Sequence, residues 1–160
     1  MSFTINTKIN GKSISASAEA STSLLEFLRD TLEMKGSKLC CNTGECGACT
    51  IIYNGMPINS CVTMAADAIG AEITTIEGLA DGDKLHPVQQ AFIEYDAFQC
   101  GFCTPGQVLA AVALLARDPD PSDEAIVRAM SGNLCRCGTY PKIVRAIHSA
   151  ASAMRGSNGD

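Results

Sequence analysis

Eight of the nine cysteines in the sequence fall into two sets of four, each with short and regular internal spacing. The first set runs Cys41-x4-Cys46-x2-Cys49, and a distant fourth member follows at Cys61. Three thiolates from one tight loop and one from further along the chain are the ligand pattern of one class of 2Fe–2S cluster. A zinc site is the structural alternative, but zinc loops favour paired C-x2-C clips. The first set therefore predicts a redox centre.

The second set joins the pair Cys100-x2-Cys103 to the pair Cys135-x-Cys137. Taken alone, these two clips suit a zinc ion and an iron–sulfur cluster equally well. A helix expected to begin at Thr104 places its positive N-terminal end near an anionic centre, which favours neither metal. Because the first set already predicts a redox centre, we interpret the second set as another 2Fe–2S site and the chain as an electron conduit.

The ninth cysteine, Cys40, directly precedes the first set. If Cys40 replaced Cys41 as a ligand, the loop would lengthen to C-x5-C. We therefore expect Cys40 to be a packed thiol that binds no iron.

Composition and sequence limit the cellular compartments in which the protein can function and the partners that it can bind. The 160 residues carry a formal net charge of −5, which makes nucleic acid an unsuitable partner. The start of the chain shows no basic region followed by an apolar stretch, and no apolar run approaches the ~18 residues of a membrane span. An odd number of cysteines also argues against a complete disulfide framework. We expect a cytoplasmic protein with no membrane span.

The first half of the chain has mainly β-strand signals. Alternating apolar residues, two Asn-Gly turns and one helical segment predict the following elements: a hairpin from Phe3 to Ala16 around Asn10-Gly11, a helix from Ser23 to Leu32 with Ser21 or Thr22 as N-cap, a hairpin of Thr50–Tyr53 and Pro57–Asn59 around Asn54-Gly55, and a strand Glu72–Ile76. A hairpin, a crossing helix, a second hairpin and a closing strand make a β-grasp arrangement.

The second half has helical signals. Four helices are predicted: from His86-Pro87 to about Ala97, from Thr104 to about Arg117, from Asp120-Pro121 onward, and from Tyr140-Pro141 to about Met154. Thr104 is expected to be an N-cap in a capping box with Gln107. The predicted fold class is α+β, with a β-grasp 2Fe–2S domain at 1–76, a linker at 77–85, a four-helix 2Fe–2S-binding domain at 86–155 and a disordered tail at 156–160.

Three motifs in order carry a family resemblance: Cys-Asn-Thr-Gly-Glu-Cys-Gly-Ala-Cys-Thr at 41–50, Gln-Cys-Gly-Phe-Cys-Thr-Pro-Gly at 99–106 and Gly-Asn-Leu-Cys-Arg-Cys-Gly at 132–138. Together they resemble the small iron–sulfur subunit of molybdenum hydroxylases, the family of xanthine oxidase, aldehyde oxidoreductase and carbon monoxide dehydrogenase. The likeness extends from about Phe3 to Ala153.

The resemblance implies a plant-type ferredoxin domain and a four-helix domain, each with one 2Fe–2S cluster. It implies that the chain is the iron–sulfur subunit of an oxidoreductase whose substrate is oxidised on a large molybdopterin-binding subunit. The helical-domain cluster would lie nearer the molybdopterin, with Gln99 and Cys137 hydrogen-bonded to the pterin. The ferredoxin cluster would pass electrons to a subunit that carries FAD, or to a cytochrome with haem. The substrate cannot be identified from this chain.

Two positions depart from the usual family pattern. Cys40 stands where the family usually has Gly, and Gly138-Thr139 inverts the more frequent Thr-Gly order. Two other function classes remain as alternatives: a free-standing two-cluster ferredoxin and a zinc-stapled interaction module. The histidines, His86 and His148, are expected at helix ends or on the surface.

Positive charge gathers around the second cysteine set, in the side chains of Arg128, Arg136, Lys142 and Arg145. We expect a solvated helix face there. A contact with a cofactor phosphate or with an acidic partner is the alternative.

Overall fold

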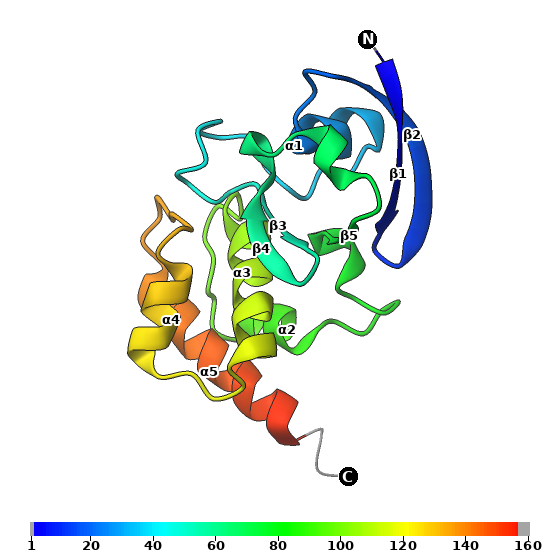
Figure 1. Ribbon diagram of the computed structural model, residues 1–160. Coiled ribbons are helices and arrows are strands. Elements are labelled where there is room, and N and C mark those ends of the chain that lie inside the picture. Colours follow the sequence, from blue (N-terminus) through cyan, green and yellow to red (C-terminus); the bar gives the residue numbers. More distant parts are fainter. Residues whose placement is uncertain (1, 157–160) are drawn as a thin grey trace.

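The computed structural model describes residues 2–156 and consists of a β-sheet half and a helical half. In Figure 1 the sheet and α1 form the upper part of the molecule, α2, α4 and α5 form the lower part, and α3 extends upward beside β3 and β4. The strands are β1 (Ser2–Ile9), β2 (Lys12–Glu19), β3 (Thr50–Tyr53), β4 (Met56–Asn59) and β5 (Glu72–Thr74). The helices are α1 (Leu24–Glu26), α2 (Pro87–Glu94), α3 (Thr104–Arg117), α4 (Asp123–Met130) and α5 (Tyr140–Gly156).

The sheet has the strand order β2-β1-β5-β3-β4. Strand β5 pairs in parallel with β1 and antiparallel with β3, so it joins the two predicted hairpins into one sheet. Both hairpins turn at Asn-Gly pairs with positive φ angles, 52° and 77° at Asn10-Gly11 and 47° and 81° at Asn54-Gly55. Such pairs suit the type I′ turns that twist with their strands. Strand β5 ends at Thr74, earlier than predicted, because a 3₁₀ turn begins at Ile76.

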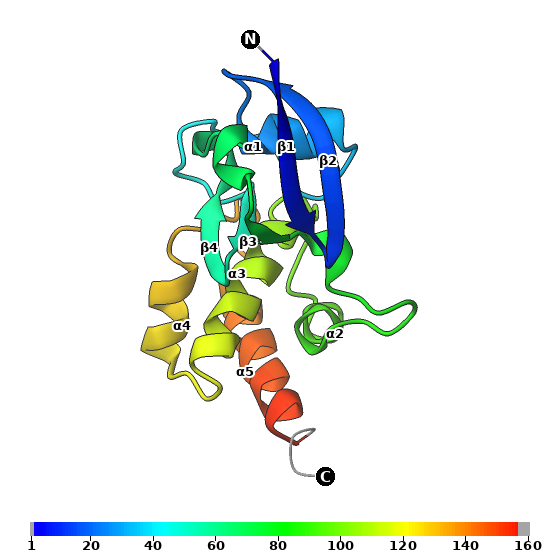
Figure 2. The same cartoon turned by 45° about the vertical axis from the view of Figure 1, so that its right-hand side comes forward.

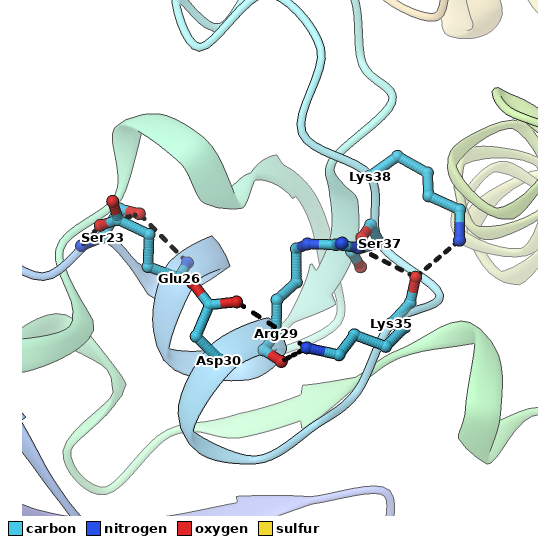
Figure 3. A network of polar contacts seen from close by, with 7 residues as sticks. All are labelled: Ser23, Glu26, Arg29, Asp30, Lys35, Ser37 and Lys38. Carbon is cyan, nitrogen blue, oxygen red and sulfur yellow. Dashed lines mark hydrogen bonds and ion pairs between the residues drawn. The ribbon is translucent and has the colours of Figure 1, made fainter.

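The N-cap of the crossing helix lies one residue after Thr22 and two residues after Ser21, the two predicted caps. Ser23, and not Ser21 or Thr22, is the N-cap of α1, and its hydroxyl accepts a hydrogen bond from the Glu26 backbone N–H at 3.2 Å. The Glu26 carboxylate accepts in return from the Ser23 N–H, which completes a capping box (Figure 3). A π-helical turn, Phe27–Thr31, continues the helix and buries Phe27 and Leu28 against the sheet.

Polar contacts tie this helix to the segment that enters the cysteine loop. The Arg29 guanidinium donates to the carbonyl oxygens of Lys35, at 3.1 Å, and Ser37, at 2.6 Å. The Lys35 ammonium donates back to the Arg29 carbonyl, and Lys38 Nζ donates to the Lys35 carbonyl (Figure 3). The Lys38 N–H then bonds the Ala48 carbonyl at 3.0 Å, so the two ends of the first cysteine loop are held together.

The helical half confirms the four predicted helices, with corrected starts. His86 caps α2 through its ring Nδ1, and Ser122 caps α4, so the third helix begins later than Asp120-Pro121. The predicted capping box at Thr104 is wrong. Cys103 is the N-cap residue, it already has helical φ and ψ angles, and no side chain caps α3. The Thr104 hydroxyl is instead buried without a hydrogen-bond partner.

Helix α3 holds the two halves together. Most of its side chains between Gly106 and Leu115 are buried, because it packs against β3 and β4 on one side and against α2 and α4 on the other. Figures 1 and 2 show α3 beginning beside β3 and β4 and running down into the helical half. Each half also has its own apolar cluster, around Phe27 and Ile51 in the sheet half and around Phe92 and Ile147 in the helical half.

The predicted limits 1–76, 77–85 and 86–155 remain proposals, and most of the predicted tail, 157–160, lies outside the described residues. None of the helices within residues 2–156 has the length and apolar character that crossing a membrane requires.

Candidate metal centres

The first cysteine set lies on the loop between the π-helical turn and β3, and its fourth member lies just after β4. Cys49 and Cys61 are buried and share a small apolar cluster with Leu25. Cys41 and Cys46 are half-buried at the outer side of the loop. The loop thus has two anchored thiols and two thiols near solvent.

Hydrogen bonds fix the shape of this loop. Asn59 Nδ2 donates to the Gly44 carbonyl at 2.6 Å, and the Ser60 hydroxyl donates to the Cys49 carbonyl at 2.7 Å. Both donors belong to the segment that carries Cys61, so the distant fourth cysteine is held against the other three.

The surroundings shift the pKa values of two of these thiols in opposite directions. Hydrogen bonds from Thr43 lower the pKa of Cys41 to about 5, and the Thr43 N–H lies 3.4 Å from its sulfur. Burial raises the pKa of Cys49 to about 11. Iron binds the thiolate form of cysteine. With these pKa values Cys41 is already ionised at neutral pH, whereas Cys49 must release a proton when it binds iron.

The prediction that Cys40 is packed is wrong, because its side chain is exposed. Cys40 and Cys46 line the same cavity, and charge repulsion from Cys46 raises the pKa of Cys40. Whether Cys40 binds iron stays an open prediction, and we retain Cys41 as the ligand.

The second set is assembled from two places in the helical half. Cys100 and Cys103 lie just before α3, and Cys135 and Cys137 lie on the loop between α4 and α5. All four line one cavity of about 460 Å³, together with side chains that include Phe102 and Tyr140. Within residues 2–156, no three Cys, His, Asp or Glu side chains are arranged to hold a single metal ion.

Hydrogen bonds and burial also act on the second set. The Cys135 N–H donates to the Tyr140 phenol oxygen at 2.8 Å, and the Thr139 hydroxyl lies 3.3 Å from the Cys135 sulfur. Burial raises the pKa of Cys135, but the contacts with Thr139 outweigh it and lower that pKa to about 7. Burial raises the pKa of Cys103 to about 12. The donor set of four thiols and the cavity that they line fit a thiolate-bound cluster.

Gln99 and Cys137 lie together on the surface. They line a cleft of about 470 Å³, to which Lys142 and Arg145 of α5 add positive charge. The sequence predicted a joint role for Gln99 and Cys137 only through the family resemblance, and the structure places them at one cleft. The Lys142 ammonium lies 4.0 Å from the exposed carboxylate of Asp96.

Three residues near the cysteines were given no role from the sequence. Asn133 is buried between the two cysteine loops, and Thr139 and Tyr140 contact Cys135. Asn133 lies inside the third sequence motif, so its position beside the cysteines was visible. Its contacts depend on how the two halves pack, which the motif does not show.

Comparison with known proteins identifies both halves. A 2Fe-2S iron-sulfur cluster binding domain matches residues 7–72, and a [2Fe-2S] binding domain matches residues 75–148. These matches favour iron–sulfur over zinc for the second set.

Relatives match the chain over nearly its full length. One of the subunits of nicotinate dehydrogenase from Pseudomonas putida is 49% identical over 97% of this chain and 99% of its own length. The aldehyde oxidoreductase iron-sulfur-binding subunit PaoA of Escherichia coli is 44% identical over 92% of this chain and 71% of its own length.

Among solved structures, quinoline 2-oxidoreductase from Pseudomonas putida superposes with a TM-score of 0.94, at 41% identity, over 99% of this chain and 98% of that one. Domain matches, sequence identity and fold agree over almost the whole chain. The chain belongs to the family of small iron–sulfur subunits of molybdenum hydroxylases.

Proposed function

We propose that this chain relays electrons from a molybdopterin site on a large partner subunit to an acceptor subunit that carries FAD or haem. Cys100, Cys103, Cys135 and Cys137 would hold the cluster that receives the electrons. The cluster that passes them on would be held by Cys41, Cys46, Cys49 and Cys61. When bound, each 2Fe–2S cluster supplies one-electron reduction and oxidation.

The observation that carries this proposal is the shared position of the two cysteine sets. The cavity lined by the four cysteines of the second set is also lined by Cys46 of the first set. The chain thus brings the two ligand loops face to face, although they are far apart in the sequence. Two ligand loops that face each other allow electrons to pass from one cluster to the other, so the arrangement supports a relay.

Exposed apolar side chains around the second set support docking of a large partner. Phe98, Phe102, Leu134 and Tyr140 are each between 39% and 55% exposed. Large apolar side chains grouped on a surface are typical of an interface between proteins. The cleft of Gln99, Cys137, Lys142 and Arg145 adjoins this group through Phe98, and we place the pterin against it.

The substrate is assigned to the partner. The relatives named above are parts of enzymes for nicotinate, aldehydes and quinoline, yet they are 41% to 49% identical to this chain. Similar small chains therefore serve different substrates. This chain offers only thiols and surface side chains at its candidate sites, so substrate oxidation belongs to the large subunit.

The experiment is isolation of the intact complex, followed by metal analysis and electron paramagnetic resonance. We expect two distinct 2Fe–2S signals from this chain, about four irons per chain, and co-purification with a molybdenum-containing subunit. One iron signal or stoichiometric zinc contradicts the relay. Two signals from a chain that purifies alone and reduces an acceptor without a partner support the free-standing ferredoxin instead.

A further inference from the structure

Asn133 is the polar side chain that joins the two cysteine loops. It is buried, with 6% of its surface exposed, and its Nδ2 donates to the Gly47 carbonyl and to the Thr50 hydroxyl oxygen, each at 3.0 Å. The backbone carbonyl oxygen of Asn133 accepts a hydrogen bond from Gln107 Nε2 of α3 at 2.7 Å. One residue of the helical half thus contacts the first cysteine loop, β3 and α3.

The neighbouring residue links the ligand loops directly. The Leu134 N–H donates to the Cys46 carbonyl at 2.9 Å. Cys46 belongs to the first set, and Leu134 precedes Cys135 of the second set. A route of covalent bonds interrupted by this one hydrogen bond therefore joins a sulfur of each set.

The backbones at this junction are in close contact. A Cβ atom added at Gly47 would lie 2.3 Å from the Gly132 carbonyl oxygen, and one added at Gly106 would lie 2.3 Å from the Gly47 carbonyl oxygen. No side chain fits between the three segments. Because the backbones are so close, we infer that the side-chain amide of Asn133 determines how these three segments are aligned.

We propose that Asn133 is a positioning residue that fixes the Leu134–Cys46 hydrogen bond, and that this bond carries electron exchange between the two cysteine sets. The proposal rests on the relay proposed above and adds the residue that controls its internal step. One electron leaves the reduced cluster of the second set and reduces that of the first set, so no atom is transferred.

Removing the Asn133 side chain should leave both halves folded. The Gly47 carbonyl also accepts from the Thr50 hydroxyl at 2.7 Å and from the Thr50 N–H at 3.1 Å, so it keeps partners when Asn133 is truncated. The loss then falls on the connection between the halves. Neither cysteine set loses a direct hydrogen bond to a sulfur.

The test uses the intact complex with Asn133→Ala. Thr50→Val is a second variant, which removes one of the two acceptors of the Asn133 amide together with the hydrogen bond that the Thr50 hydroxyl donates to the Gly47 carbonyl. Asn10→Ala is the matched control. The Asn10 side chain also bridges distant segments, at 2.9 Å to Thr75, but it lies within the sheet half away from the cysteine loops. Four quantities are measured in the parent and in each variant. They are the iron content, the reduction potential of each cluster, the magnetic interaction between the two reduced clusters and the rate of electron exchange after flash reduction.

We expect Asn133→Ala to keep its iron and both reduction potentials, while the magnetic splitting weakens and the exchange rate falls several-fold. Thr50→Val should show a smaller change in the same direction, and Asn10→Ala should match the parent. If Asn133→Ala keeps the magnetic splitting and the exchange rate of the parent, the positioning role of Asn133 is wrong, although the relay itself can still hold. If Asn133→Ala does not fold, the same result in Thr50→Val leads to the same conclusion. A parent complex without two clusters overturns the proposed function.

Discussion

The hydroxyl oxygen of Thr139 lies 3.3 Å from the sulfur of Cys135 and 3.3 Å from the carbonyl oxygen of Ala97. The hydroxyl has one proton for these two acceptors. A cluster-bound thiolate carries no proton and is negatively charged, and hydrogen bonds to charged acceptors are the stronger ones. With a cluster in place, we therefore expect Thr139 to donate to the sulfur. Thr139 is also one of the positions that depart from the usual family pattern.

Replacing Thr139 by Val should lower the reduction potential of the second cluster. The donor stabilises the reduced form most, because that form carries more negative charge, so its loss makes reduction harder. Thr139→Ser keeps the hydroxyl and should retain the parental potential. A redox titration followed by electron paramagnetic resonance measures both. An unchanged potential in the Val variant would mean that the proton stays on the Ala97 carbonyl.

The ligand assignment of the first set predicts different outcomes for two cysteine changes. Cys61→Ser should damage the first cluster and leave the second assembled, because Cys61 is buried in the sheet half and lines no part of the second cavity. Cys40→Ser should leave both clusters intact. Iron content and the two resonance signals report the result. Loss of the first signal in Cys40→Ser would transfer the ligand role from Cys41 to Cys40.

Two glycine changes test the close contact between the halves. Alanine normally stabilises a helix position relative to glycine by about 0.5–1 kcal/mol. At Gly106 in α3 the sign should reverse, because the added Cβ would lie 2.3 Å from the Gly47 carbonyl oxygen and overpacking costs about 1–3 kcal/mol. Gly132→Ala is the control, since nothing lies within 4 Å of its added Cβ. Thermal unfolding of the two variants should give a lower Tm for Gly106→Ala alone.

The acidities of the thiols predict a pH-dependent pattern of alkylation in the cluster-free protein. Thiolates react and thiols do not, so at pH 7 iodoacetamide should modify Cys41, with a pKa of about 5, and spare Cys103, with a pKa of about 12. The Cys41 rate should fall as the pH drops through about 5, and the Cys103 rate should rise only toward pH 12. Peptide mass spectrometry follows each site. Equal rates at pH 7 would contradict the hydrogen bonding from Thr43.

The sequence predicts the local elements well and their caps less well. Both Asn-Gly turns and all four helices of the second half follow from strong local signals, and the structure confirms them. At Thr104 the capping-box pattern failed because the turn between Cys100 and Cys103 already has helical geometry at its end. Cys40 was expected to be packed because the loop spacing gave it no role as a ligand, yet its side chain is exposed.

Contacts between the halves are the part that the sequence could not predict. The bonds of Asn133 to Gly47 and Thr50 join residues more than 80 positions apart, at separations of 86 and 83. No local pattern encodes such a pairing, which depends on α3 packing beneath β3. The ligand spacing predicted the two sites, and only the packing shows that one loop faces the other.

Removal of the first cluster tests the order in which electrons pass through the two clusters. If Cys61→Ser removes the first cluster from the assembled complex, substrate should still reduce the molybdenum and the second cluster, because Gln99 and Cys137 lie at one cleft beside the second set. Delivery to the external acceptor should stall. Rapid mixing with substrate, followed by absorbance and electron paramagnetic resonance, separates the two steps. The control is Cys40→Ser, which should transfer electrons at the parental rate. If the acceptor is still reduced at the normal rate without the first cluster, electrons leave from the second set directly and the proposed order is wrong.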